Sequence, residues 1–293
     1  MMDREGLNTH LKSGATTVCR AWEVRRTDGV TLGFTDHDRD LSFDGMTFRA
    51  GTGLSARSLM QSTGLAVDNS EALGALSSDA VREADIESGR YDGAEVRAWL
   101  VNWADTTERA LQFRGSLGEI RRAGGAFEAE LRGLTEALNQ PLGRVFQKPC
   151  SAVLGDAACK FDLSTAGYAV EIDVETLRDG QLFAWASLDG FAPGWFTGGR
   201  LTVLGGAGAG LWAPIRSDSL NARREITLWQ PIRADIQPGD LVRLSAGCDK
   251  RQSTCRLKFD NLVNYQGFPD IPGEDWMVAV PKRTGQNTGG SRR

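Results

Sequence analysis

The stretch TVCRAWEVRRTDGVTLGFT, residues 17–35, carries the clearest fold signal in the chain. In its first half, Trp22 and Val24 alternate with residues that would point to the opposite face, which is the period-two pattern of a β-strand. Asp28-Gly29 is a favoured pair for a two-residue turn, and strand-forming residues resume directly after it. We therefore predict a β-hairpin over 17–35.

The same pattern recurs along the rest of the chain. Asp44-Gly45 turns a second predicted hairpin, and a three-stranded meander is predicted over 95–103, 108–122 and 126–133. Further strands are predicted within 168–177, 181–187, 199–204, 210–217, 224–232 and 240–247. Helix signals are confined to 78–88 and 133–143. The predicted fold is mainly β, with two or more small barrel or sheet domains and few short helices.

The two groups of strands predict two domains and a tail. Residues 1–162 form the predicted N-terminal β-rich domain, which ends in a first cysteine pair. Residues 163–280 form a predicted C-terminal β domain with a second pair. Residues 281–293, PKRTGQNTGGSRR, are polar, glycine-rich and basic, and we predict that they are disordered because they have no apolar surface to bury.

Composition restricts the class of function. The chain has 293 residues and a net charge of −4, so there is no overall basic field to hold nucleic acid. No apolar stretch approaches the ~20 residues of a membrane helix, and the first residues lack the apolar core of a secretory signal. We expect synthesis in the cytoplasm and no membrane anchor.

Four of the five cysteines form two pairs that flank the second group of strands. The pairs are Cys150 with Cys159 and Cys248 with Cys255, whereas Cys19 lies on the first predicted strand and is expected to be buried. Disulfides need an oxidising compartment, and structural zinc usually uses closer cysteine spacings. An iron–sulfur cluster also takes four thiolates. Spacing alone leaves these interpretations open, together with four unrelated core cysteines.

The segment GCDKRQSTCRLKFDNLVNYQGFPDIPG, residues 247–273, resembles the C-terminal signature of a phage-type tail-tip and baseplate hub family. That family includes the hub protein of gene transfer agents, and the tail-tip protein L of lambda-like phages is a more distant relative. Segments 22–50 and 199–244 also resemble it, so the similarity covers nearly the whole chain in order. The pattern consists of Gly247, Cys248, Asp249, Lys250, Thr254, Cys255, Phe259, Asn261, Asn264, Gly267 and Pro269.

The resemblance implies a structural protein and not an enzyme. It implies that Cys150, Cys159, Cys248 and Cys255 hold one iron–sulfur cluster of the [4Fe-4S] type, which staples the two cysteine segments together. It also implies a homotrimeric baseplate ring around a DNA channel, between the distal tail protein and the large tail-tip fibre protein. DNA would pass without specific binding. The alternatives are an iron–sulfur redox enzyme and a hub stapled by zinc.

Three other stretches invite a functional interpretation and are predicted to lack one. The glycine-rich loop over 204–212 does not have the spacing of a phosphate-binding loop and precedes a strand, so we predict a hairpin loop. Asp36, His37 and their acidic neighbours are predicted to form a solvated turn, because one histidine with no second nearby is a weak metal site. Cys19 with His37 forms no recognised nucleophile motif, so no catalytic residue is predicted.

Overall fold

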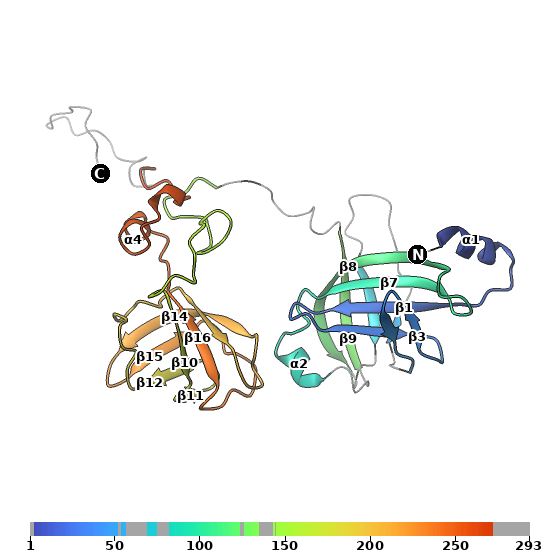
Figure 1. The fold of residues 1–293 in the computed structure, drawn as a ribbon, viewed down its shortest axis with the longest axis horizontal. Helices are drawn as coiled ribbons and strands as arrows, with labels where there is room; N and C mark the ends of the chain where they lie inside the picture. Colours follow the sequence, from blue (N-terminus) through green and yellow to red (C-terminus); the bar gives the residue numbers. More distant parts are fainter. Residues whose placement is uncertain are drawn as a thin grey trace. The chain divides into compact units, whose positions relative to one another are not determined.

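A computed structural model describes residues 3–51, 54–56, 69–74, 82–123, 126–134, 143 and 145–271. The chain divides into two compact units, residues 1–142 and 143–293, and each is built around a β-sheet (Figure 1). The prediction of a mainly β fold with few short helices is confirmed.

The first unit contains a seven-stranded sheet with the order β2-β1-β7-β8-β9-β6-β5 and a separate β3-β4 hairpin. All of the strand pairs in this sheet are antiparallel. The predicted hairpins and the predicted meander are all present. The elements are α1 Arg4–Lys12, β1 Val18–Arg25, β2 Thr31–Thr35, β3 Leu41–Phe43, β4 Met46–Phe48, β5 Leu54–Ala56, β6 Asn69–Gly74, α2 Glu83–Glu87, β7 Glu95–Asn102, β8 Arg109–Ala123 and β9 Ala126–Gly133.

Strand β1 is covered on both faces, which its alternating sequence did not predict. Trp22 and Val24 pack into one hydrophobic cluster of the unit, whereas Cys19 and Ala21 pack into a second cluster that includes residues of the β3-β4 hairpin. Successive side chains of a strand point to opposite faces, so one strand can serve two cores. Glu23 is consequently buried as well, at 8% exposure.

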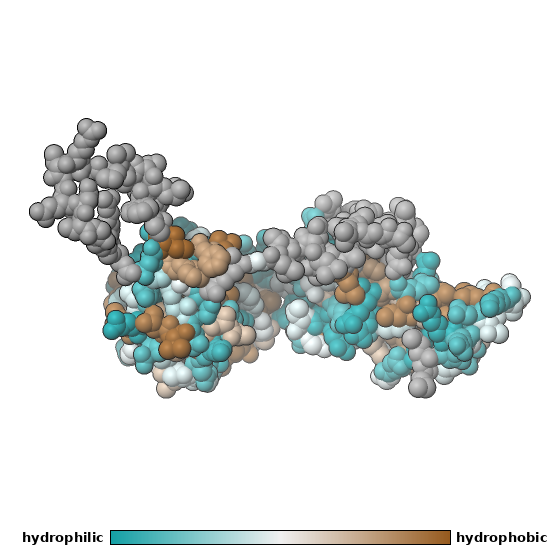
Figure 2. Space-filling view, turned by 90° about the horizontal axis from the view of Figure 1, so that it is seen from above, coloured by the Kyte–Doolittle hydropathy of each residue, from teal (hydrophilic) through white to brown (hydrophobic). Residues whose placement is uncertain are grey.

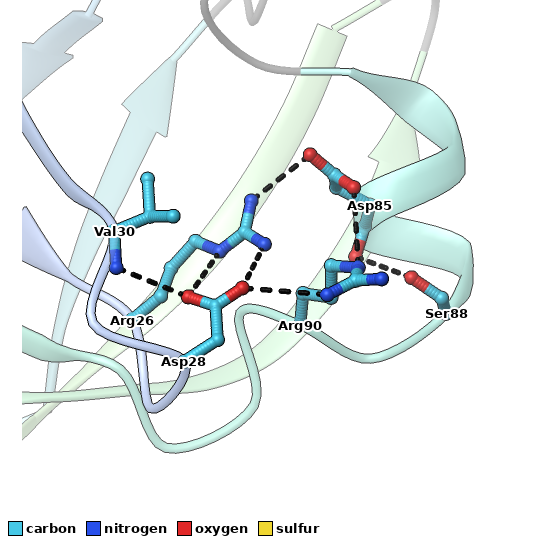
Figure 3. Close-up of polar contacts among 6 residues, drawn as sticks. All are labelled: Arg26, Asp28, Val30, Asp85, Ser88 and Arg90. Carbon is cyan, nitrogen blue, oxygen red and sulfur yellow. Dashed lines mark hydrogen bonds and ion pairs between the residues drawn. The ribbon is translucent and has the colours of Figure 1, made fainter. Parts of the chain in front are cut away.

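A network of ion pairs joins the turn after β1 to helix α2 (Figure 3). The buried Arg26 guanidinium pairs with Asp28 in the turn and with Asp85 in α2, at 2.9 Å for the second pair. Arg90 pairs with the same two carboxylates at 3.4 and 3.3 Å. Helix α2 lies within the helix predicted over 78–88, of which residues 78–81 lie outside the described residues.

The second unit also contains a seven-stranded antiparallel sheet, with the order β10-β16-β13-β14-β15-β12-β11. The two edge strands are consecutive in the chain and are separated only by Val174 and Glu175, so the sheet curls back toward itself (Figure 1). The elements are β10 Ala169–Asp173, β11 Thr176–Arg178, β12 Leu182–Trp185, β13 Arg200–Val203, β14 Trp212–Leu220, β15 Arg224–Leu228, β16 Leu241–Ser245, α4 Gln252–Leu257 and the 3-10 helix η1 Leu262–Asn264.

The curled sheet encloses the core of the second unit. Phe183, Trp185 and Ile215 are among its fully buried side chains, and the Trp185 indole N–H donates to the Asp173 carbonyl at 2.8 Å. The hairpin loop predicted for the glycine-rich stretch 204–212 is present. Residues 204–211 form the loop between β13 and β14.

A buried ion pair fixes the loop between β12 and β13 to this core. The Asp218 carboxylate accepts hydrogen bonds from the Arg224 guanidinium, at 2.8 Å for one of them, and from the Phe196 backbone N–H at 3.0 Å. Arg224 also donates to the carbonyls of Phe191 and Ala192 at 3.0 and 2.7 Å. Both charged side chains are almost fully buried.

The division between the units differs from the predicted domain boundary at 162. It falls between Leu142 and Gly143, so both cysteine pairs belong to the second unit. The physical reason is that the segment carrying the first pair bonds to the segment carrying the second; for example, the Cys150 N–H donates to the Lys250 carbonyl at 2.9 Å. The strand pattern used to place the boundary contains no information about such long-range bonds.

Two α-helices of the described residues, α1 and α4, were not predicted, and neither was the 3-10 helix η1. Helix α1 begins at an N-cap, Asp3, whose carboxylate accepts the Gly6 N–H at 2.8 Å. Most of the helix predicted over 133–143, and the whole tail over 281–293, lie outside the described residues. Within the described part of the chain, no helix combines the length and apolar character needed to span a bilayer.

Candidate four-cysteine site

The pairing of two strands brings the cysteine segments to one end of the second sheet. Strand β10 is the first strand of this sheet and β16 is the last, and they pair antiparallel with Ala169 opposite Ser245. The chain therefore enters β10 and leaves β16 at the same place. The Ala246 N–H continues the ladder by donating to the Tyr168 carbonyl at 2.7 Å. The end of segment 145–168 and the beginning of segment 246–271 therefore lie side by side.

Hydrogen bonds hold these two segments together over their length. Besides the bond from Cys150 to Lys250, the Phe268 N–H donates to the Gln147 carbonyl at 2.9 Å. The Tyr265 hydroxyl donates to the Lys148 carbonyl at 2.8 Å. The two segments form one module, which we call the cysteine module and define as residues 145–168 and 246–271.

All four paired cysteines line one small cavity of the cysteine module. Cys150 and Cys159 come from the first segment, and Cys248 and Cys255 from the second. Among the described residues that line this cavity there is no carboxylate or imidazole side chain, whereas Lys250 and Arg251 are present. The donor set is therefore made of thiols with cationic neighbours. All four are free cysteines, and Cys255 is buried.

The arrangement differs from a ready-made site for a single ion. Among the residues that the structure describes, no group of three or more His, Cys, Asp or Glu side chains is placed to hold one metal ion. A zinc ion would need its thiolates about 2.3 Å from one point. The iron–sulfur staple that the fold prediction included is thus not shown as a metal-binding group, although its four predicted ligands surround one cavity.

A loop capped by Asp156 positions Cys159. The carboxylate accepts the N–H groups of Cys159 at 2.6 Å, of Ala158 at 2.9 Å and of Val153 at 2.8 Å. These backbone bonds, with that of Cys159 as the largest contribution, lower the pKa of Asp156 below its ordinary value. The residue after Cys159, Lys160, has a φ of 57°, which turns the chain sharply out of the loop.

Cys255 is positioned by helix α4 and by the chain that follows it. Its N–H donates to the Arg251 carbonyl at 3.0 Å within the helix. The Thr254 hydroxyl donates to the Asp249 carboxylate at 2.9 Å, which ties the helix to the residue after Cys248. Helix α4 is short and has no side-chain cap at Arg251. Tertiary contacts therefore stabilise it, and its local sequence gave no strong helix signal.

Lys258 supports the other cysteine of the second pair. Its ammonium group donates to the carbonyls of Trp195 at 2.6 Å and of Gly247 at 2.9 Å, and it lies 4.2 Å from the centre of the Trp195 ring. Burial lowers the pKa of Lys258, while the neighbouring Cys248 and acidic groups oppose that shift. A half-buried cation thus fixes the residue directly before Cys248.

Burial favours the protonated form of the Cys248 and Cys255 thiols by raising the pKa of each. It is the largest cause of the rise in the pKa of Cys255 to about 11, and the charges of Cys248, Cys150 and Cys159 add to it. Burial also raises the pKa of Cys248, although the Lys250 N–H and its positive charge oppose the rise. A metal must therefore displace protons to bind, and its own positive charge is what makes four clustered thiolates stable.

The remaining stretches take the positions that the sequence predicted. Cys19 is buried, and burial raises its pKa to about 11, so it is an unreactive thiol. The Asp36 carboxylate accepts the Arg20 N–H at 2.6 Å, and Asp40 accepts the Ala50 N–H at 2.8 Å. These carboxylates cap the backbone of turns, as expected of a structural loop.

Sequence reasoning missed the residues that hold the ligands. Asp156 and Lys258 were not singled out. Asn261 was noted only as part of the family pattern, yet its side-chain amide donates to the Cys159 carbonyl at 2.7 Å. Lys258 and Asn261 contact residues far away in the sequence, and Asp156 bonds to three backbone N–H groups of its own loop. Neither kind of contact leaves a periodic signal.

Two models of known protein families match parts of the chain. A family model described as "Baseplate hub protein, N-terminal attachment domain" matches residues 4–162. A second one, described as "Phage conserved hypothetical protein BR0599", matches residues 194–275, which include the second cysteine pair. The first match ends at 162, where the sequence also predicted a boundary, whereas the compact units divide at 142/143.

A solved structure resembles the chain over almost its whole length. It is the virion of a native gene transfer agent (GTA) particle, and one of its chains is 54% identical to this chain with a TM-score of 0.91. The match covers 98% of this chain and 99% of the other. A comparison with curated proteins finds no match.

Proposed function

Because this chain belongs to the baseplate hub protein family, we propose that it is the structural hub of the tail baseplate in a gene transfer agent or siphophage-like particle. The observation that carries the proposal is the likeness to a chain of a gene transfer agent virion, at 54% identity over 98% of this chain. A match of that extent includes both units and leaves no large region for a different activity. The proposed role is structural and not enzymatic.

In the proposed assembly, three copies of the chain form a ring around the channel through which DNA leaves. The ring lies between the distal tail protein and the large tail-tip fibre protein, and DNA passes without specific binding. The net charge of −4 supports this arrangement, because a wall rich in Lys and Arg would retain the phosphate backbone.

The surface of the cysteine module supports a role in protein contacts. Val263 is 97% exposed, Leu257 83% and Phe146 67%, although all three are large and apolar. Figure 2 shows hydrophobic areas among hydrophilic ones on the exposed surface of this unit. Apolar groups gathered on a surface mark interaction sites in proteins. We assign this surface to contacts within the baseplate.

We propose further that Cys150, Cys159, Cys248 and Cys255 hold one [4Fe-4S] cluster. The support is the donor set, which consists of four thiols around one cavity with Lys250 and Arg251 beside them. Four thiolates are the usual ligands of such a cluster, and cationic neighbours reduce its negative charge. When bound, the cluster would supply metal–thiolate bonds that join the two cysteine segments, so its binding free energy becomes folding free energy.

The assembly is tested in intact particles. Cryo-electron microscopy of particles that carry this chain should show three copies of it in a ring at the baseplate, in contact with the distal tail protein and the tail-tip fibre protein. Particles assembled from a deletion strain should lack a complete baseplate. A chain that is absent from purified particles, or present as a monomer away from the tail, would disprove the proposal.

The metal is tested on protein purified without oxygen. Iron and sulfide should be present in equal amounts, and a serine at any one of the four positions should remove the brown colour and lower soluble yield. Cys19→Ser is the matched control, because Cys19 lies in the first unit and should not affect colour. Stoichiometric zinc without iron would instead establish the zinc-stapled hub.

A further inference from the structure

Asn261 contacts a cysteine of each pair. Asn261 lies shortly after Cys255, and its backbone N–H donates to the Cys255 carbonyl at 3.0 Å. The Cys255 thiol in turn donates to the Asn261 carbonyl, with 3.3 Å between sulfur and oxygen. The backbone of Asn261 is thus bonded on both sides to the cysteine of helix α4.

The side chain of Asn261 reaches the other pair. Its amide nitrogen donates to the Cys159 carbonyl at 2.7 Å and lies 3.5 Å from the Cys159 sulfur, although these two residues are 102 positions apart. The amide oxygen accepts the Asn264 side-chain N–H at 2.7 Å. Since Asn264 occupies the oxygen, the nitrogen must face Cys159.

We propose that Asn261 is a positioning residue of the four-cysteine site, and that Asn264 fixes the orientation of its amide. The inference rests on the proposed cluster, because positioning has a measurable effect only where the thiols bind a metal. Asn261 would hold Cys159 and Cys255 at a fixed separation before metal arrives. Its N–H would also stabilise negative charge on the Cys159 sulfur, as hydrogen bonds to cluster sulfurs do.

The side-chain origin of this donor makes the inference testable. Gln266 also donates to a ligand, since its backbone N–H lies 3.4 Å from the Cys150 sulfur, but a substitution cannot remove that group. The Asn261 amide can be removed, or it can be changed to a carboxyl group with little change in volume. Groups that support metal ligands in this way typically contribute 10–100-fold to metal affinity.

Four variants of the full chain separate a donor from a packing role. Asn261→Ala removes the amide, and Asn261→Asp keeps the acceptor for Asn264 but replaces the donor to Cys159 by a second oxygen. Asn264→Ala leaves Asn261 in place without its orienting bond. Asn221→Ala is the matched control, because the Asn221 amide donates to Glu225 at 3.2 Å in an exposed turn of the same unit.

The measurement is the rate at which iron passes from anaerobically purified protein to a chelator, together with the iron–cysteine stretching bands in the resonance Raman spectrum. We expect loss about 10–100-fold faster in Asn261→Ala. Asn261→Asp should be at least as fast, Asn264→Ala intermediate and Asn221→Ala unchanged. The stretching bands should shift in both Asn261 variants, which a general loss of stability would not produce. If Asn261→Ala does not fold, Asn264→Ala still tests the inference.

Two results distinguish failure of the inference from failure of the cluster proposal. Wild-type protein with neither iron nor sulfide would overturn the cluster proposal. The iron and sulfide contents of the wild type are therefore measured before any variant is compared. Wild-type protein with a cluster, alongside an Asn261→Asp variant that retains iron at the wild-type rate with unshifted bands, would overturn the role of Asn261 alone.

Discussion

Asp218→Ala should be among the most destabilising single substitutions in the second unit. It leaves the Arg224 guanidinium buried, at 2% side-chain exposure, without the carboxylate that balances its charge. It also removes the acceptor of the Phe196 N–H. The two carbonyls that remain bonded to Arg224 supply partial charges only.

The magnitude follows from the burial of the pair. Removing one partner of a buried ion pair costs about 3–5 kcal/mol, because the other charge stays buried and unpaired. At about 2–4 °C per kcal/mol for a unit of this size, the melting temperature should fall by roughly 6–20 °C. Replacing both partners, as Asp218→Leu with Arg224→Met, should restore most of the loss, because no buried charge then remains.

A neighbouring ion pair provides the control. Arg223 and Glu175 are paired at 2.6 Å, but their side chains are 43% and 42% exposed. Exposed pairs contribute about 0–1 kcal/mol, so Arg223→Ala, which leaves the bond from the Ala186 N–H to Glu175 in place, should change stability little. Urea unfolding followed by tryptophan fluorescence measures all of these variants. A loss below about 1 kcal/mol for Asp218→Ala, or a double variant whose loss equals the sum of the single ones, would refute the reasoning.

Three further predictions concern pH, packing and DNA. Burial raises the pKa of Asp28, but hydrogen bonds from Arg26 and from the Val30 N–H outweigh it, so the net effect is a lowered pKa. The stability that Asp28 contributes is therefore complete above pH about 3.9 and is lost as the pH falls below it. Thermal melts between pH 3 and 7 should therefore show a smaller acid loss in Asp28→Asn than in the wild type; an equal loss would contradict this. Gly247→Ala would place a methyl carbon 1.8 Å from the Thr197 carbonyl oxygen, so the backbone before Cys248 must shift and the yield of soluble, iron-containing protein should decrease. Gly143→Ala is the control and should not lower this yield, because a methyl group added at Gly143 meets no atom within 4 Å. Duplex DNA should bind no more tightly than the 10⁻⁴–10⁻⁶ M typical of non-specific contacts at about 0.15 M salt, as measured by fluorescence anisotropy; tighter binding with a steep salt dependence after deletion of 282–293 would indicate a real DNA-binding face.

Local pattern predicted the strands and not the way they are covered. The alternation around Trp22 and the Asp28-Gly29 pair were sufficient for the β1-β2 hairpin, since both features act within a few residues. The burial of Ala21 on the other face of β1 was not predictable in this way, because it depends on a second core built from other strands. Helix α4 was missed because its six residues have no capping side chain. Contacts outside the helix, such as the hydrogen bond from the Thr254 hydroxyl to the Asp249 carboxylate, stabilise it.

The candidate site, too, has a part that the sequence predicted and a part that depends on long-range pairing. The four cysteines were identified from their spacing and from a family resemblance, and the structure brings all four to one cavity. Their convergence depends on β10 pairing with β16, which no local pattern encodes. The supporting bond of Asn261 to Cys159 depends in turn on that convergence, whereas the bonds of Asp156 lie within its own loop. Sequence therefore predicted the candidate ligands, and the long-range pairing was needed to find what positions them.

The pairing of the first strand of the second sheet with the last one has a consequence for synthesis on the ribosome. Cys150 and Cys159 are made before any strand of this sheet, and Cys248 and Cys255 after all of them. A nascent chain that stops before β16 has only half of the thiols and no partner strand to gather them. The four thiols can therefore meet only after Cys255 has been made, so that shorter translation products would be unable to bind the proposed cluster.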